Sequence, residues 1–168
     1  MEGSVEIENE SNMGLVLRLK TEFIDFDPLS PHDANNDRSK TGTGFLLEID
    51  GDIVIVTAHH VISNFKSVLA TTQRANRGET MQCDVIGQNP KLDVAILTCE
   101  NNEVYNMPHF KCGRSSLLAP KDKLHIYGFA GGTIRTHSTT GTCSGRSDYP
   151  NNRFQTDTAV KDRKSTRL

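Results

Sequence analysis

Short runs of aliphatic and β-branched residues recur through the middle of this chain, and turn-forming residues separate them. Branched side chains favour strands, whereas Gly, Pro, Asn and Asp favour tight turns such as Asp50-Gly51-Asp52 and Asn89-Pro90. No internal repeat or heptad is visible, and we expect no helix beyond a short turn after His60. The pattern predicts an all-β barrel or sandwich. The predicted strands are 15–19, 44–49, 53–56, 67–72, 81–87, 94–98, 124–129 and 154–160.

Polar segments flank and interrupt the predicted strands. Residues 1–12 are polar, and we expect them to be disordered. Residues 25–40 gather Asp, Pro, Ser, Asn and Lys, which predicts a long surface loop. We expect 100–120 to be a loop as well, and 133–144, rich in Thr and small residues, to be a solvated hairpin. A chain of 168 residues is long enough for one domain, or for two small barrels that share an interface.

The charge pattern argues against a nucleic-acid or membrane partner. The formal net charge is -2, and the two signs are mixed along the chain rather than blocked. No segment approaches the roughly 18 consecutive apolar residues that a membrane helix needs. The acidic start, Met1 to Glu8, lacks the apolar core of a secretory signal and the Arg-rich composition of a transit peptide. We therefore expect an intracellular protein in a reducing compartment.

The four cysteines, Cys83, Cys99, Cys112 and Cys143, do not have the spacing of metal ligands. Cys83 and Cys99 lie in or beside predicted strands, which favours buried thiols. A disulfide is the alternative, and the sequence does not demand one.

A histidine pair and an aspartate stand beside two of the predicted strands. Thr57-Ala58-His59-His60-Val61 follows the run 53–56, and Asp93 opens the run 94–97. Nucleophilic catalysis by a hydroxyl needs an imidazole that takes its proton, and the end of a buried strand can present that imidazole to a cleft. The same chemistry needs a carboxylate that fixes the imidazole tautomer and stabilises the imidazolium. The two segments together predict such a pair.

Structural roles are the alternative for the same residues. The histidine pair can be a packed or surface feature, and Asp93 can be a cap or a paired surface charge. Metal binding is a weaker alternative, because adjacent residues of an extended strand face opposite ways and rarely chelate one ion. We therefore predict no metal site and no cofactor.

These motifs resemble those of trypsin-like serine proteases of the HtrA/Deg family. In that family's Thr-x-Ala-His-Val motif the catalytic histidine directly precedes the valine, which corresponds to His60 and leaves His59 in the position of a small residue. The resemblance implies that His60 is the general base and then the general acid, and that Asp93 orients it. Further segments match the family in the same order. They are 41–45 (Thr-Gly-Thr-Gly-Phe), 113–116 (Gly-Arg-Ser-Ser), 124–132, 139–141, 144–146 and 155–160 (Gln-Thr-Asp-Thr-Ala-Val).

The family pattern breaks after Val160. The family continues with Asn-Pro-Gly-Asn-Ser-Gly-Gly-Pro, whereas this chain continues with Lys161-Asp162-Arg163-Lys164-Ser165. Ser165 stands at the serine position by count, but it lacks the glycines that let backbone N–H groups point at a developing oxyanion. We therefore predict that Ser165 is not a working nucleophile. Residues 162–168 resemble the in-frame translation of a common sequencing adapter, so we interpret 161–168 as a non-native tail, with a natural basic tail as the alternative.

The resemblance implies an all-β fold of two chymotrypsin-like antiparallel barrels with the active site between them. Residues 13–100 are expected to form the first barrel, and 114–160 to start a second, incomplete barrel. The implied activity is that of a serine endopeptidase acting on unfolded or exposed polypeptide, in a parent protein that forms homotrimers; this fragment is expected to be inactive. Two alternatives stay open: a non-catalytic barrel that binds polypeptide, and a viral-type trypsin-like processing protease.

Overall fold

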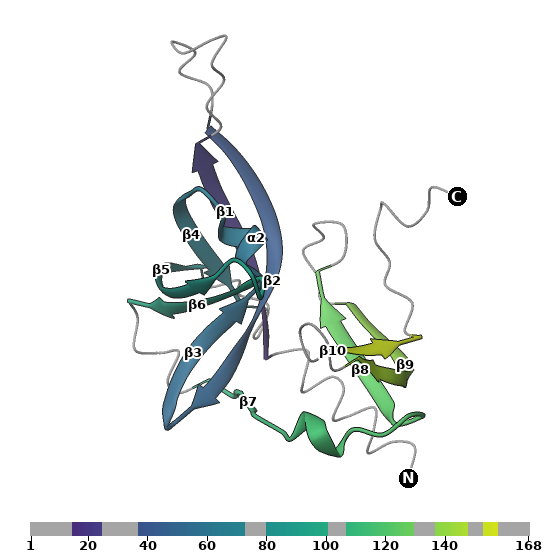
Figure 1. Ribbon diagram of the computed structural model, residues 1–168. Coiled ribbons are helices and arrows are strands. Elements are labelled where there is room, and N and C mark those ends of the chain that lie inside the picture. Colours follow the sequence, from purple (N-terminus) through teal and green to yellow (C-terminus); the bar gives the residue numbers. More distant parts are fainter. Residues whose placement is uncertain are drawn as a thin grey trace, which may run out of the picture.

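Figure 1 shows the computed structural model, which describes residues 15–24, 37–72, 80–100, 107–129, 137–147 and 153–157. These residues form two β units, a larger barrel and a smaller sheet, which stand side by side. The barrel strands are β1 (Val16–Ile24), β2 (Asp37–Ile49), β3 (Asp52–Thr57), β4 (Phe65–Thr71), β5 (Thr80–Asn89) and β6 (Val94–Cys99). The sheet strands are β8 (Lys123–Gly128), β9 (His137–Ser147) and β10 (Arg153–Thr156).

The larger unit is a closed six-stranded barrel. Its strands follow the order β1-β4-β5-β6-β3-β2, and an antiparallel pairing of β1 with β2 joins the two ends of that order. Closure leaves no unpaired edge among these six strands, which is one way in which β proteins avoid edge-to-edge association. The short strand β7 (Phe110–Lys111) then adds to β2 in the parallel direction.

Apolar side chains from every barrel strand fill the interior. Alternation along β4 and β6 places one face inward, because successive side chains of a strand point to opposite faces. The largest fully buried aliphatic side chains are Leu17, Leu19, Leu46, Ile55, Ile62, Val68 and Leu97. Burial of these residues is the main stabilising contribution to the unit that carries the histidine and aspartate motifs.

Local sequence explains the tight connection between β2 and β3. Ile49 pairs with Asp52, so the loop consists of Asp50 and Gly51 alone. Both loop residues have positive φ, 52° and 88°, as the type I′ hairpin turn requires. Asp and Gly are among the few residues that adopt this conformation at low energetic cost. The predicted turn at this position is therefore confirmed.

The smaller unit is a three-stranded antiparallel sheet in the order β10-β9-β8. A segment containing β7 and the 3₁₀ helix η3 (Ser115–Leu117) leads from the barrel to it, as Figure 1 shows in green. The sheet touches the barrel through β8, where the Phe129 backbone N–H donates to Thr43 Oγ1 at 3.0 Å. Among the described residues near this sheet, only Phe129 and Cys143 are buried apolar side chains.

Three sequence-based expectations differ from the structure. Residues 37–40 belong to strand β2, in register with β1, so the predicted surface loop 25–40 is wrong over these four positions; 25–36 lie outside the described residues. The segment 137–144 is part of one strand that pairs on both sides, not a solvated hairpin of its own. The expected loop 100–120 contains β7 and η3. At 37–40, 110–111 and 137–144, partner strands satisfy the backbone of a polar segment.

Several predicted segments lie outside the described residues, among them the N-terminal 1–12 and the C-terminal 158–168. None of the helices in the described part of the chain has the length and apolar composition required to span a membrane.

Candidate active site

His60 is carried on a single helical turn at the end of strand β3. The strand ends at Thr57, Ala58 is still extended (φ -76°, ψ 141°), and helix α2 covers His59–Ile62. Val61 and Ile62 are buried in the barrel, which anchors the turn. The side chain of His60 points outward and is 74% exposed. The apolar residues after the histidine pair therefore hold the turn, and the imidazole stays accessible.

Asp93 stands at the end of the turn between β5 and β6. The side-chain oxygen of Asn89 accepts hydrogen bonds from the backbone N–H groups of Lys91 and Leu92, both at 3.1 Å. The Asp93 N–H donates to Pro90 O at 3.3 Å, and Asp93 itself has a left-handed φ of 56°. Asp tolerates this region better than most residues. The Asn-Pro turn thus directs the Asp93 carboxylate toward the end of the neighbouring strand.

The imidazole of His60 and the carboxylate of Asp93 are in direct contact. His60 Nδ1 lies 2.7 Å from Asp93 Oδ2, and the His60 backbone N–H donates to Asp93 Oδ1 at 2.9 Å. The predicted contact between these two residues is therefore present in the structure. Both hydrogen bonds to His60 hold the pKa of the Asp93 carboxyl below its ordinary value. An ionised Asp93 keeps the proton on Nδ1, which leaves Nε2 as the basic nitrogen of a neutral ring.

Pairing of β3 with β6 brings the two residues together from positions 33 apart in sequence. Thr57, three positions before His60, lies opposite Ala95, two positions after Asp93. The two motifs therefore emerge at the same end of two adjacent strands. Because strand register fixes this relation, the contact does not depend on the smaller sheet.

His59 takes no part in the contact with the carboxylate, which involves the side chain and backbone of His60. The sequence argument assumed an extended backbone at this pair, but His59 and His60 both lie in helix α2. Adjacent helical residues still diverge, by about 100° around the axis. Among the described residues, no three His, Cys, Asp or Glu side chains gather where they could hold a metal ion.

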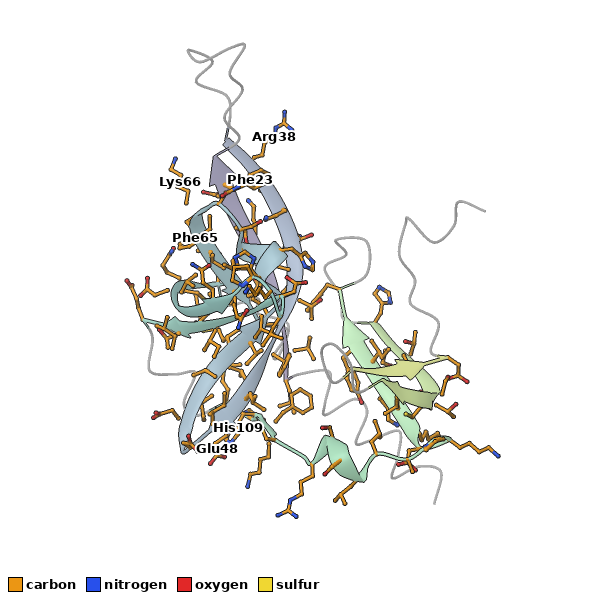
Figure 2. The ribbon with its side chains drawn as sticks, in the orientation of Figure 1. Phe23, Arg38, Glu48, Phe65, Lys66 and His109 are labelled. Atoms are coloured by element: carbon orange, nitrogen blue, oxygen red, sulfur yellow. The ribbon has the colours of Figure 1, made fainter. Side chains whose placement is uncertain are left out.

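Lys40 is a site residue that the sequence analysis missed. Its ammonium group donates to His60 O at 2.7 Å, to Ser63 O at 3.1 Å and to Ser63 Oγ at 2.8 Å. The same group lies 5.1 Å from the ring centroid of Phe23, a residue labelled at the upper end of the barrel in Figure 2. Partial burial lowers the pKa of Lys40. Lys40 thus connects strand β2 to the C-terminal end of the turn that carries His60.

Gly42 and Thr43 show why the segment 41–45 has small residues. A Cβ atom on Gly42 would lie 2.5 Å from Val61 Cγ1, so only glycine lets β2 lie directly against helix α2. Thr43 O accepts a hydrogen bond from Thr57 Oγ1 at 2.8 Å, and Thr43 Oγ1 accepts the one from Phe129 N–H. The segment therefore packs against the His60 turn and also joins the barrel to the sheet.

The Gln-Thr-Asp segment has a structural role in the smaller sheet. Both carboxylate oxygens of Asp157 accept hydrogen bonds from Thr142, one from its backbone N–H and one from Oγ1. The two bonds hold the pKa of Asp157 below its ordinary value. Asp157 therefore fastens the end of β10 to β9. Ser165, the remaining residue weighed as a nucleophile, lies outside the described residues.

Other titratable contacts lie away from the His60–Asp93 pair. His109 Nε2 is 2.9 Å from Glu48 Oε2, at the end of the barrel opposite Phe23 and Phe65 (Figure 2). His109 also contacts Met107 O through Nδ1 at 3.2 Å. These contacts fasten the segment that leaves the barrel and add no group to the candidate active site.

Comparison with known proteins agrees with this geometry. A family model described as a trypsin-like peptidase domain matches residues 42–165. A curated protein of Pseudomonas putida (strain GB-1), the "Probable periplasmic serine endoprotease DegP-like", is 30% identical over 92 residues. That alignment covers 54% of this chain and 18% of the relative, so the chain spans a small part of that protein's length.

Proposed function

Because this chain belongs to the trypsin-like peptidase family, with a resemblance to its HtrA/Deg type, we propose that it is part of a serine endopeptidase that hydrolyses peptide bonds in unfolded or exposed polypeptides. The observation that carries the proposal is the 2.7 Å contact between His60 Nδ1 and Asp93 Oδ2. A carboxylate on Nδ1 is what a histidine needs in order to act through its other nitrogen as a base.

We assign the two residues separate roles. Nε2 of His60 takes the proton of the attacking serine hydroxyl and later gives a proton to the leaving amine. Asp93 keeps the imidazole in the required tautomer and stabilises the imidazolium, without itself becoming protonated. The lowered pKa of Asp93 is consistent with this role, because the carboxylate stays ionised at neutral pH. The chemistry requires no metal and no cofactor.

The nucleophile is the part of this proposal that the 168 residues do not supply. The sequence contains no Gly-x-Ser-Gly-Gly segment, and the residues flanking Ser165 are Lys164 and Thr166. Without glycines the turn cannot point two backbone N–H groups at an oxyanion. We therefore propose that the 168-residue chain is inactive. A non-catalytic barrel that binds polypeptide is the second candidate, and a Gly-x-Ser-Gly-Gly segment after Val160 in the source transcript would separate the two.

An extended chain tests the proposal. The chain is rebuilt from Val160 with Asn-Pro-Gly-Asn-Ser-Gly-Gly-Pro and the remainder of a trypsin-like second barrel, then treated with a fluorophosphonate probe that labels activated serines. We expect labelling of the introduced serine, and none of the 168-residue chain. Absence of labelling in a correctly folded extended chain would favour the non-catalytic barrel. Specific labelling of Ser165 in the 168-residue chain would contradict the assignment of that residue.

Substitutions in the extended chain separate the roles of the residues. His60→Ala should slow labelling and peptide hydrolysis by roughly 10⁶-fold, and Asp93→Asn by roughly 10⁴-fold. His59→Ala is the matched control and should leave both rates within a few-fold of the unsubstituted chain. Equal losses in the His59 and His60 variants would overturn the assignment. Light scattering on the extended chain measures the homotrimer that the HtrA/Deg resemblance implies.

A further inference from the structure

Cys83 and Cys99 form a pair of facing thiols on the barrel. Cys83 lies in β5 and Cys99 in β6, directly opposite each other in the antiparallel register. Their sulfur atoms are 3.1 Å apart while both are free thiols. The sequence predicted buried thiols at these two residues, with a disulfide as the alternative; Cys83 is buried, whereas Cys99 is only partly buried. The structure identifies the partners.

The backbone geometry allows a disulfide at this pair without rearrangement. Gln82 and Glu100 stand opposite each other, next to the cysteine pair. The Glu100 N–H donates to Gln82 O at 3.4 Å, so these two residues form a hydrogen-bonded pair of the ladder. Pairs alternate along an antiparallel ladder, so Cys83 and Cys99 occupy a non-hydrogen-bonded position, where Cα atoms are about 4.5 Å apart. That separation lies within the range seen for disulfides.

The two thiols differ in exposure and in acidity. Cys83 is 3% exposed and packs in the barrel core, whereas Cys99 is only partly buried. The hydrogen bond between the two thiols lowers the pKa of Cys99, and the same interaction together with burial raises the pKa of Cys83. The thiolate is the reactive form of cysteine. Cys99 therefore reacts first with an oxidant, and Cys83 then completes the disulfide.

We propose that Cys83 and Cys99 are a redox modification site at which a disulfide closes the open end of the β5–β6 hairpin. With a low-molecular-weight disulfide as the oxidant, the Cys99 thiolate attacks one of its sulfur atoms and releases one thiolate. Cys83 then loses its proton and attacks the Cys99 sulfur, which releases the second thiolate. The protein loses two protons and two electrons, and the oxidant is reduced to two thiols.

The closed ring includes the turn that positions Asp93. The two cysteines are 16 positions apart, and Asp93 lies between them at the far end of the same hairpin. A disulfide restricts the unfolded chain and so stabilises the hairpin relative to its open form. Oxidation therefore strengthens the element that holds the carboxylate against His60. Formation of this disulfide depends on the fold of the barrel and not on protease activity.

A peptide map of the 168-residue protein tests the proposal. The reduced protein is incubated with oxidised glutathione, the remaining thiols are alkylated under denaturing conditions, and trypsin then cuts after Lys91. Because each of the four cysteines falls in a different tryptic peptide, the map distinguishes every pairing. We expect the peptide 78–91 linked to the peptide 92–111. Glutathione retained on Cys99, or a link to Cys112 or Cys143 instead, would overturn the proposal.

Thermal unfolding provides the second measurement. We expect the midpoint of the oxidised protein to lie roughly 6–12 °C above that of the reduced protein. The difference should vanish in Cys99→Ser and persist in Cys112→Ser, the matched control at an exposed cysteine. An equal midpoint in both redox states of the unsubstituted protein would contradict the stabilising role, whatever the variants show.

Discussion

The barrel and the three-stranded sheet differ in how completely they bury their apolar side chains. Barrel closure places seven large aliphatic side chains out of contact with solvent, whereas the described residues of strand β8 are all at least partly exposed. Both candidate catalytic residues, His60 and Asp93, lie on the barrel. The comparison indicates that a closed unit fixes the geometry of the pair without help from its neighbour. Among the described residues, a hydrogen bond from the Phe129 N–H to Thr43 connects the sheet to the barrel.

The largest expected effect comes from one substitution made in each region. Leu19→Ala removes a fully buried side chain from the barrel and should lower the free energy of unfolding by about 2–5 kcal/mol. Leu124→Ala in β8 removes a partly exposed side chain and should lower the free energy of unfolding by a clearly smaller amount. Urea unfolding followed by circular dichroism measures both. Equal costs would break the distinction between a closed and an open unit.

Gly42→Ala tests the packing of strand β2 against the helix that carries His60. The new Cβ clashes with the buried Val61 side chain. We therefore expect the free energy of unfolding to fall by about 1–3 kcal/mol and the turn that carries His60 to be displaced. Gly113→Ala is the matched control outside the barrel, because nothing lies within 4 Å of its added Cβ. Urea unfolding and the chemical shifts of His60 report the two effects. If Gly42→Ala changed neither the free energy of unfolding nor the chemical shifts of His60, the close packing of β2 against helix α2 would be contradicted.

Lys40→Met removes the ammonium group that donates to His60 O and to Ser63. We expect the free energy of unfolding to fall by only about 1 kcal/mol, because the hydrogen bonds are partly exposed. The Nδ1 proton of His60 should exchange faster with solvent in this variant, because the turn loses its connection to β2. Lys40→Arg should restore part of the protection, and Lys111→Met in β7 should leave the proton unchanged. An unaltered exchange rate in Lys40→Met would show that Val61 and Ile62 hold the turn unaided.

Thr43→Val addresses the connection between the two regions. The variant keeps the shape of the side chain but removes the acceptor of the Phe129 N–H, which should cost about 0.5–1.5 kcal/mol. Hydrogen exchange should accelerate at Phe129 and in β8, while the barrel amides keep their protection. Equal acceleration in barrel and sheet would mean that the two units unfold together, which would contradict the comparison.

The smallest effects concern two carboxylates, Asp93 in the barrel and Asp157 in the sheet. Hydrogen bonds lower the pKa of both, so the unfolded chain binds more protons than the folded chain between about pH 4 and the lowered pKa values. Their stabilising contribution is fully present above that pH and is lost as the pH falls through the lowered pKa values. Asp93→Asn and Asp157→Asn should each flatten the acid limb of the stability curve, measured by unfolding at a series of pH values. A slope that neither variant changes would contradict the two hydrogen-bonded contacts.

Much of the fold follows from local pattern, and the chymotrypsin-like, all-β architecture is confirmed by the closed barrel. The runs 53–56 and 94–98 became β3 and β6 because branched residues bounded by turn residues favour strands. The prediction was wrong at 37–40, where polar residues suggested a loop. Their backbone is paired with β1 in register, and such pairing is decided by a strand remote in sequence.

Neighbouring residues are enough to specify the local elements of this protein: the Asp-Gly hairpin, the turn after His60, and the Asn-Pro turn that ends at Asp93. These depend on the conformational preferences of a few neighbouring residues. The tertiary structure alone decided that β3 lies beside β6, that Lys40 reaches the backbone of His60, and that Cys83 faces Cys99. Strand order and register follow from burying one common core in a closed barrel, and that constraint acts on the whole chain at once rather than on any one segment.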